Sequence, residues 1–239
     1  MKILVLSSLY PNDAQPRHGI FIEHRVSHVA GPGDEIRVVA PVPWFPSAHP
    51  RFGHYAEFAR VPGRDERRGI AITHPRYPLV PKLSHLTPTM MAGAVGRHID
   101  EIRRDFDFDV IDAYYLYPDA IAAGMIARRV DRPVVMTALG SDVSLIAQAP
   151  FERRRIVAAT DQAATVTAVC GALRDELIAV GAAADKVCVI EHGVDLVLFQ
   201  PPTDHTASRA RLGIDAPTVL IVGHLIDLKG QDLAIRAVA

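Results

Sequence analysis

Three residues that could bind a ligand, Arg17, His18 and Gly19, lie at the start of an amphipathic helix predicted for residues 19–30. A buried strand is predicted just before them, at Ile3 to Ser8, so the first turn of the helix lies past a strand end. Free backbone N–H groups and the positive helix end at such a position suit a phosphate or a sugar hydroxyl. The alternative is that Gly19 only relieves a tight turn and that Arg17 is solvated.

The segment from Pro41 to Pro62 is a long irregular loop that holds the single tryptophan of the chain, Trp44. Its prolines cannot donate backbone hydrogen bonds, which prevents regular structure. A loop of this length inside a compact domain usually serves a function or moves. Trp44 and the adjoining Phe45 are able to stack on an apolar or sugar acceptor, and simple packing beneath the loop is the alternative.

Several other chemistries lack their motif. The sequence contains no Gly-x-x-x-x-Gly-Lys-Ser phosphate loop, no Gly-x-Gly-x-x-Gly, no His-Glu-x-x-His and no Gly-x-Ser-x-Gly. The 11 histidines are dispersed without ligand spacing, so we expect no metal site. The two cysteines, Cys170 and Cys188, are too few and too far apart for a disulfide framework, so we expect buried thiols and a cytoplasmic location.

The composition is that of an ordinary globular protein. Of the 239 residues, 49% are hydrophobic and 22% are charged, and the formal net charge of -1 gives no general attraction to nucleic acid. No apolar run approaches the roughly 18 residues of a membrane span. A helix predicted for residues 92–104 carries Arg97, Arg103 and Arg104 outward, which form either a solvated face or a weak peripheral contact with the inner face of a membrane.

Strands and helices alternate along the chain, which predicts an α/β fold with a Rossmann-like parallel sheet flanked by helices. Ligands of such sheets bind at the carboxyl ends of the strands. The charged run at residues 64–68 is expected to be a solvated turn. Strands are expected at residues 3–8, 35–40, 69–73, 109–115, 133–138, 165–169 and 187–190, and helices at 19–30, 92–104, 119–129, 143–160 and 171–180.

The stretch from Lys186 to Pro202 divides the chain. It begins with the apolar residues of the last strand, breaks at Gly193 and ends in two prolines, which stop regular structure. We therefore expect one domain at residues 1–200, followed by a linker and the first βα unit of an incomplete second domain at residues 201–239. In that unit a helix is predicted at 208–212, a strand at 218–222 and a helix at 229–239, and we expect the functional cleft between the two parts.

Three stretches carry a resemblance: ILVLSSLYPNDAQPRHGIFIEHRV near the start, VVMTALGSDVSLI in the middle, and VIEHGVDLVLFQP followed by VLIVGHLIDLKGQDLAIRA. Taken together and in this order, they resemble the retaining glycosyltransferases of family 4, which have the two-domain GT-B fold. The resemblance runs over essentially the whole chain. It implies that residues 1–200 are the N-terminal, acceptor-side domain and that residues 201–239 begin a truncated nucleotide-sugar-binding domain.

The resemblance implies a donor site in the last segment. Gly223 and Lys229 match a Gly-x-x-x-x-x-Lys-Gly segment whose basic residues hold the donor diphosphate in the family, and His224 stands where many relatives have a second basic residue. A nearby ammonium group stabilises the negative charge that develops on a leaving diphosphate. The alternative for Lys229 is a surface lysine at a helix start.

The resemblance also assigns residues to the acceptor side and to the cleft. Ser141 and Asp142 match a Gly-Ser-Asp segment that faces the cleft, although Asp142 is also able to cap the next helix. Tyr114 stands where many relatives have a histidine. The implied set is Arg17, His18, Gly19, Tyr114, Ser141 and Asp142 on the acceptor side, and Glu191, Gly193 and Asp195 in the interdomain cleft, with no catalytic residue assigned.

The implied function is hexosyl transfer from a nucleotide sugar to an acceptor hydroxyl, with retention and without a metal or other cofactor, in polysaccharide or glycoconjugate biosynthesis. The implied partners are the nucleotide sugar, a sugar or lipid-linked acceptor and the missing C-terminal domain. Because the paired-glutamate motif of the family is not found in the sequence, we expect this chain alone to be inactive. The alternatives are a non-catalytic carbohydrate-binding or scaffold domain, and a GT-B-like sugar epimerase or phosphorylase.

Overall fold

The computed structural model describes residues 1–80, 83–223 and 225–238, and of Leu228 the backbone alone. The chain divides into two compact units, Met1–Gly193 and Val194–Ala239. The first unit ends somewhat before residue 200, where the sequence placed the domain boundary. The chain leaves the sheet after its last strand, which ends at Val189, and the boundary between the two units follows at Gly193.

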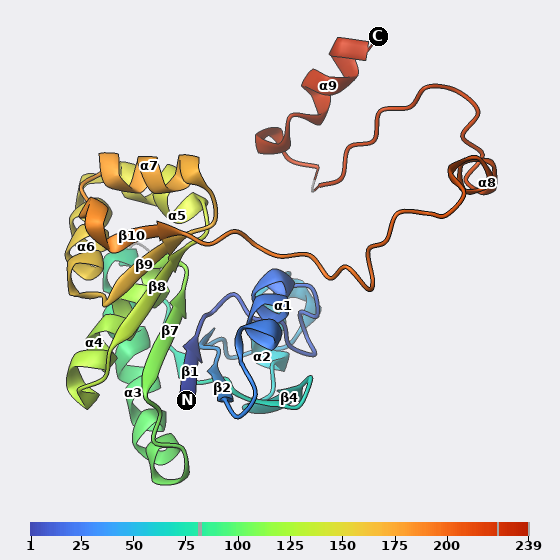
Figure 1. Cartoon of the computed structure of the whole chain (residues 1–239). Coiled ribbons are helices and arrows are strands. Elements are labelled where there is room, and N and C mark those ends of the chain that lie inside the picture. The colour runs from blue at the N-terminus through green and yellow to red at the C-terminus, as the bar shows by residue number, and fades with distance from the viewer. Residues whose placement is uncertain (81–82, 224, 239) are drawn as a thin grey trace. The chain divides into compact units, whose positions relative to one another are not determined.

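The first unit is built on an eight-stranded sheet with the strand order β10-β9-β8-β7-β1-β2-β5-β4 (Figure 1). Each neighbouring pair is parallel except β4 with β5. The predicted α/β fold with a Rossmann-like parallel sheet is therefore confirmed. The strands are β1 Lys2–Leu6, β2 Glu35–Val39, β4 Arg64–Arg67, β5 Ile70–Thr73, β7 Val110–Tyr114, β8 Val134–Ala138, β9 Thr165–Ala168 and β10 Val187–Val189.

Helices contribute to an apolar core on each face of the sheet. On one face, Ile22 and Val26 of α1 join Val5 and Val38 of the strands. The core of the other face is larger and includes side chains of α3, α4, α6 and α7. Burial on both sides explains the continuous apolar runs of the strands. The helices are α1 Ile20–Val29, α3 Thr87–Asp105, α4 Ile121–Val130, α5 Ser141–Ser144, α6 Pro150–Gln162 and α7 Gly171–Ala179, with short turns η2 Ser84–Leu86, η3 Leu116–Ala120, η4 Ile146–Gln148 and η5 Ala184–Lys186.

Residues 64–67 of the charged run form the edge strand β4, so the predicted solvated turn was wrong there, and Arg68 lies in the turn that follows. β4 pairs with β5 in antiparallel register, and Arg67 of β4 and Arg68 of the following turn both contact a buried acid. Arg67 Nε donates to Glu23 Oε1 of α1 at 2.6 Å, and Arg68 Nε lies 3.5 Å from Glu23 Oε2. Charged side chains are tolerated on an edge strand because one of its sides faces solvent, and here Arg67 and the adjoining Arg68 also neutralise a carboxylate beneath α1.

The proline-rich segment after β2 has more regular structure than its sequence suggests. Its first residues form β3, Val42–Pro43, which pairs in parallel with β6, Arg76–Tyr77. A 3-10 turn, η1 Pro50–Phe52, and a short helix, α2 Tyr55–Arg60, follow. The expectation of an irregular loop was wrong here because the prolines sit at strand ends and at a turn start, where a missing N–H costs little.

Both cysteine thiols are exposed, contrary to the predicted burial. Cys170 directly precedes α7, and Cys188 lies on β10, which is the strand at one edge of the sheet. An edge strand has a neighbour on one side only, so its side chains lose less contact with solvent than those of a central strand. The apolar residues around Cys188 predict a strand, but they do not indicate whether that strand lies at the edge or in the centre of the sheet.

The second unit contains the helices α8 His205–Arg211 and α9 Gln231–Val238 and the turn η6 Asp227–Lys229. Asp204 caps α8, because its side chain accepts a hydrogen bond from the Ala207 N–H at 2.9 Å. The predicted strand at 218–222 is absent from the described part of this unit, where these residues have no regular secondary structure and Val219, Leu220 and Val222 are exposed. An apolar run forms a strand only where another strand pairs with it.

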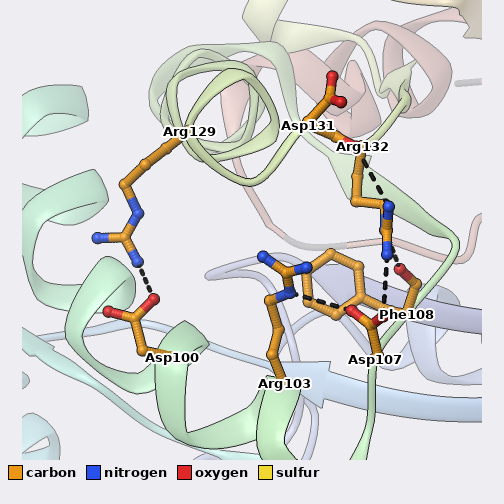
Figure 2. A network of polar contacts seen from close by, with 7 residues as sticks. All are labelled: Asp100, Arg103, Asp107, Phe108, Arg129, Asp131 and Arg132. Atoms are coloured by element: carbon orange, nitrogen blue, oxygen red, sulfur yellow. Dashed lines mark hydrogen bonds and ion pairs between the residues drawn. The ribbon is translucent and has the colours of Figure 1, made fainter.

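Helix α3, which carries the arginines of the predicted basic face, takes part in an ion-pair network at the amino-terminal edge of the sheet (Figure 2). Arg103 Nε donates to Asp107 at 3.0 Å, and Arg132 of the segment after α4 binds the other oxygen of Asp107 at 3.0 Å. Arg103 is thus already paired with an acid. Within residues 1–80, 83–223 and 225–238, no helix has the length and apolar character needed to cross a membrane.

The buried acid beneath α1 predicts an asymmetric response to mutation. Arg67→Met would leave the Glu23 carboxylate, whose side chain is 3% exposed, with Arg68 alone. We expect urea unfolding to show a loss of about 2–3 kcal/mol, because a desolvated charge loses its closest partner. The control Arg103→Met breaks an exposed pair and should cost below about 1 kcal/mol. Equal losses in the two variants would contradict this account of Glu23.

Candidate functional site

The carboxyl ends of three adjacent strands, β1, β7 and β8, bring the predicted acceptor-side residues to one edge of the sheet. The loop after β1 carries Arg17, His18 and Gly19, η3 follows β7, and α5 begins directly after β8. Parallel strands end at the same edge, which is where ligands of open α/β sheets bind. This carboxyl edge of the first unit is the candidate site.

Asp142 is the point at which two of these strand ends are joined. Its side chain is fully buried and accepts backbone N–H groups from Leu116 at 2.9 Å, Gly140 at 2.8 Å and Leu139 at 3.2 Å. Burial raises the pKa of Asp142, and these three N–H donors oppose that rise. The capping alternative was wrong, because the donors precede α5 or belong to η3. The carboxylate of Asp142 positions the loop around Ser141.

Ser141 and Tyr115 form the polar group that reaches solvent at this edge. Their hydroxyl oxygens are 3.0 Å apart, Ser141 is exposed, and Tyr115 is half-buried. Tyr115 has a φ of 77°, in the left-handed region that bulky residues rarely adopt. A strained residue at a strand end is a common feature of functional sites, because the surrounding structure must hold it in place. Sequence reasoning missed Tyr115 and named its neighbour.

That neighbour, Tyr114, lies in the core of the α1 face. Its side chain is buried, its hydroxyl donates to Asp112 Oδ2 at 2.7 Å, and the guanidinium of Arg25 lies 5.7 Å from its ring centre. Burial, followed by the negative charge of Asp112, raises the pKa of Tyr114. Successive side chains along a strand point to opposite sides, so Tyr114 enters the core whereas the next residue, Tyr115, lies at the carboxyl edge.

Asp119 is a second buried carboxyl that the sequence analysis did not single out. It lies on η3 and accepts hydrogen bonds from the backbone N–H of Ser8 and, at 3.0 Å, from the Ser8 hydroxyl. Burial raises the pKa of Asp119 to about 7, against the opposing effect of the hydrogen bonds from Ser8. Asp119 therefore holds Ser8, near the start of the loop that leads to Gly19. The sequence did not indicate that Asp119 is buried, because an acidic residue after Pro118 at a predicted helix start is usually exposed.

Gly19 has a strict steric reason. Its φ is 65°, and a Cβ at this position would lie 2.1 Å from the carbonyl oxygen of Leu9. The tight-turn explanation for Gly19 therefore holds in the structure. His18 beside it is half-buried, and burial lowers its pKa, partly offset by a hydrogen bond to the Ser8 backbone. Arg17 is exposed at the same entry to α1.

Residues after β10 lie against α1 within the first unit. The Arg25 guanidinium donates to the carbonyl of Ile190 at 3.2 Å, and the rings of Phe21 and His192 lie 5.4 Å apart. These contacts place Glu191 and Gly193, both exposed, beside α1. Two predicted groups that are far apart in the sequence are therefore neighbours at this edge.

The remaining predicted residues belong to the second unit. Asp195 accepts the N–H groups of Val197 at 2.9 Å and Leu198 at 3.0 Å, which makes a local turn. Gly223 and Lys229 lie close together, since a Cβ on Gly223 would be 3.7 Å from Lys229 Cγ, and Lys229 is exposed. His224 lies outside the described residues.

A separate pocket of about 440 Å³ lies at the opposite, amino-terminal edge of the sheet. Three of the charged groups that line it are already paired: Asp34 with the N-terminal amine, Arg37 with Asp105, and Arg68 with Glu23. Because these three charged groups are already paired and no predicted site residue lines the pocket, we do not assign the site to it. We place the candidate site at the carboxyl edge.

Solved structures define the class of fold. The chain matches HepE of Anabaena in complex with UDP with a TM-score of 0.60, at 20% identity, covering 100% of this chain and 57% of that one. It also matches sucrose-phosphate synthase from Thermosynechococcus elongatus with a TM-score of 0.59, at 13% identity, covering 90% and 52%. These likenesses confirm the GT-B type of α/β fold for the first unit.

The family follows from the sequence comparisons. The model of Glycosyltransferase Family 4 matches residues 21–198, and the chain belongs to this family. TuaC of Bacillus subtilis, named for teichuronic acid biosynthesis, is 31% identical over 243 residues, covering 96% of this chain and 60% of TuaC. A D-inositol 3-phosphate glycosyltransferase of Catenulispora acidiphila is 32% identical over 166 residues, covering 62% and 38%. The chain thus spans less than two thirds of these relatives.

The close approach at Gly19 predicts a specific loss. Gly19→Ala should lower the free energy of unfolding by about 3 kcal/mol, because the new methyl group meets a backbone oxygen that cannot move aside. Gly33→Ala is the matched control: Gly33 also has a positive φ, 88°, but no atom lies within 4 Å of its added Cβ. Its expected cost is about 1 kcal/mol. Thermal or urea unfolding that ranks the two variants equally would contradict the steric explanation.

Asp119 predicts a pH dependence. The carboxyl has a reference pKa of 3.8 and a folded pKa of about 7, so the folded state holds this proton more tightly than the unfolded chain. The free energy of unfolding therefore falls as pH rises from about 4 to 7. Asp119→Asn should flatten this fall by on the order of 3 kcal/mol across that range. Asp112 and Asp142 remain in the variant, so their contributions cancel in the comparison.

The measurement is urea unfolding at several pH values between 4 and 7. Asp119→Asn keeps an acceptor for the Ser8 N–H, whereas Asp119→Ala leaves that group unpaired and should cost about 1–3 kcal/mol at every pH. If the wild type and Asp119→Asn have parallel pH profiles, the carboxyl does not titrate in this range and the assignment is wrong.

Proposed function

We propose that the protein carrying this chain transfers a hexosyl group from a nucleotide sugar to an acceptor hydroxyl, with retention of configuration. Membership of Glycosyltransferase Family 4 supports the transferase class. The likeness to HepE, which was solved in complex with UDP and with UDP-glucose, supports a nucleotide-sugar donor. The observation that carries the proposal is the carboxyl edge itself, where three adjacent strand ends present Tyr115, Ser141 and the start of α1.

On this proposal, the carboxyl edge of the first unit binds the acceptor. Ser141 and Tyr115 would bind sugar hydroxyls, and the loop with Arg17 and His18 would border them. Both oxygens of the pair are able to donate and accept hydrogen bonds, which suits a hydroxyl-rich ligand. The buried carboxyls of Asp119 and Asp142 would keep these loops in one geometry, so that less order has to be imposed when the acceptor binds.

The donor diphosphate is assigned to the second unit, with Gly223, His224 and Lys229. The exposed ammonium of Lys229 lies beside Gly223, whose lack of a side chain allows a phosphate to approach the backbone. Lysine supplies a point charge for the leaving nucleoside diphosphate as negative charge develops on it. On this proposal the charge of Lys229 takes the place of a metal at the diphosphate.

Transfer is proposed to need more than these 239 residues, since the relatives and solved structures that the chain matches are considerably longer. The first unit would then be one half of an active site. The proposed acceptor is a saccharide or lipid-linked saccharide, in line with the biosynthetic role in the name of TuaC.

Transfer assays test this proposal. The protein with this chain extended to the length of its relatives should convert UDP-glucose or another nucleotide sugar, whereas residues 1–239 alone should show no turnover. Tyr115→Phe and Ser141→Ala should each lower kcat/KM roughly tenfold, the effect of one lost hydrogen bond. Ser27→Ala, whose hydroxyl donates to the His24 carbonyl within α1, is the control and should leave kcat/KM unchanged. Turnover by residues 1–239 at an ordinary enzyme rate would refute the division of the site.

A further inference from the structure

The segment after β3 presents a group of stacked aromatic rings. The Phe45 and Tyr55 rings are nearly parallel, with centroids 5.6 Å apart, and Phe52 meets Phe45 edge-on at 5.3 Å. Tyr55 is 45% exposed, and Trp44, directly before Phe45, is 59% exposed. We call the three rings of Phe45, Phe52 and Tyr55, together with the exposed Trp44 that precedes Phe45 in the sequence, the aromatic platform. Large rings left open to water on this scale commonly mark a binding surface.

The backbone beneath the platform is fixed by tertiary contacts. The Trp44 N–H donates to the Tyr77 carbonyl at 2.7 Å, and Ala56 of α2 is buried. The Arg76 guanidinium donates to the carbonyls of Phe58 and Val61, which ties the end of α2 to β6. Rings held in this way lose little conformational entropy when a ligand settles on them.

The platform adjoins the candidate acceptor site. The segment leaves the sheet after β2, at the same carboxyl edge as the loop after β1. Gln15 of that loop donates to Glu57 of α2 at 3.0 Å, so the loop that leads to His18 is bonded to the helix that carries Tyr55. A ligand chain that begins at the carboxyl edge therefore has the platform within its reach.

The charge around the platform is positive. The guanidinium of Arg51 lies 4.6 Å from the Phe52 ring centre, and the His54 ring lies 4.0 Å from that of Tyr55. From residue 44 to residue 60 the sequence has Arg51 and Arg60 but a single acid, Glu57, and that acid is bonded to Gln15. Flat apolar rings beside exposed cations match a ligand that has apolar faces and negative charges.

We propose that the aromatic platform binds an acidic saccharide, a pyranose chain that carries carboxylate groups. The C–H face of a pyranose ring covers an aromatic ring, and the carboxylate reaches Arg51. This inference rests on the proposed function, because it names the class of acceptor that the carboxyl edge serves. A nucleic acid is not favoured, since the surface lacks the larger set of cations that phosphate chains need.

Trp44 is the single tryptophan of the sequence, so tryptophan fluorescence reports on the surroundings of this one residue. The 239-residue chain is titrated with tetragalacturonic acid, and Trp44 emission is followed at about 150 mM salt, where weak long-range attraction is screened. Maltotetraose, a neutral chain of equal length, and sodium sulfate at matched ionic strength are the comparison ligands. We expect saturable binding of tetragalacturonic acid, at least about fivefold weaker binding of maltotetraose, and no response to sulfate.

Variants that keep Trp44 locate the site. Tyr55→Ala should raise the Kd for tetragalacturonic acid roughly tenfold, and Arg51→Gln should raise it roughly fivefold and abolish the preference over maltotetraose. The matched control is Phe151→Ala on α6, which removes a ring of similar exposure, 43%, that also has an arginine, Arg155, over it. Its Kd should equal that of the wild type. Circular dichroism and urea unfolding confirm that each variant is folded.

Three results would overturn the inference: no change in Trp44 emission with either saccharide, equal affinity for the acidic and neutral chains, or equal weakening by Phe151→Ala and Tyr55→Ala. Because binding is measured without a donor, it is independent of transfer. Saccharide binding without transferase activity in the extended protein would refute the proposed function and leave the platform in place. Transfer to an acidic acceptor with an unchanged KM in Tyr55→Ala would refute the platform and leave the function in place.

Discussion

Two buried carboxyls hold the candidate site together. Asp142 takes backbone N–H groups from both the β7 and the β8 strand ends, and Asp119 takes the N–H and hydroxyl of Ser8 after β1. Loops after parallel strands have no ladder to satisfy their backbone groups, so an acceptor must be supplied from a side chain. A single carboxylate with its two oxygens can do this for two neighbouring loops at once, which makes their geometry interdependent.

This arrangement has an electrostatic cost that bears on function. Burial disfavours the charged form of both acids and raises the pKa of each, most clearly for Asp119. In return, Tyr115 and Ser141, which reach solvent, are held through their backbones, and their side-chain hydroxyls bond to each other. The site therefore separates the residues that fix the backbone from those available to a ligand. Such a division is common where a binding geometry must exist before the ligand arrives.

The fold was largely predictable because its signals are local. The β1, β7 and β8 runs are short, apolar and bounded by turn residues, and buried parallel strands have that pattern wherever they occur. The predictions failed where pairing decides the outcome. Residues 64–67 are charged yet form an edge strand beside β5, and residues 218–222 are apolar yet form no strand in the described second unit. Hydrogen-bonding partners, which the local sequence does not contain, made both differences.

The sequence by itself determined the alternation of strands and helices, and it placed the Arg17–Gly19 loop and the Ser141–Asp142 segment at strand ends. Those follow from periodicity and chain order, which are properties of the chain alone. The need for glycine at position 19 follows instead from the Leu9 carbonyl, which the fold brings against it. Only the tertiary structure decided that Tyr114 enters the core while Tyr115 faces solvent, and that Asp119 is buried under the first loop. The direction and the burial of a side chain depend on the residues that pack against it, and those residues come from distant parts of the sequence.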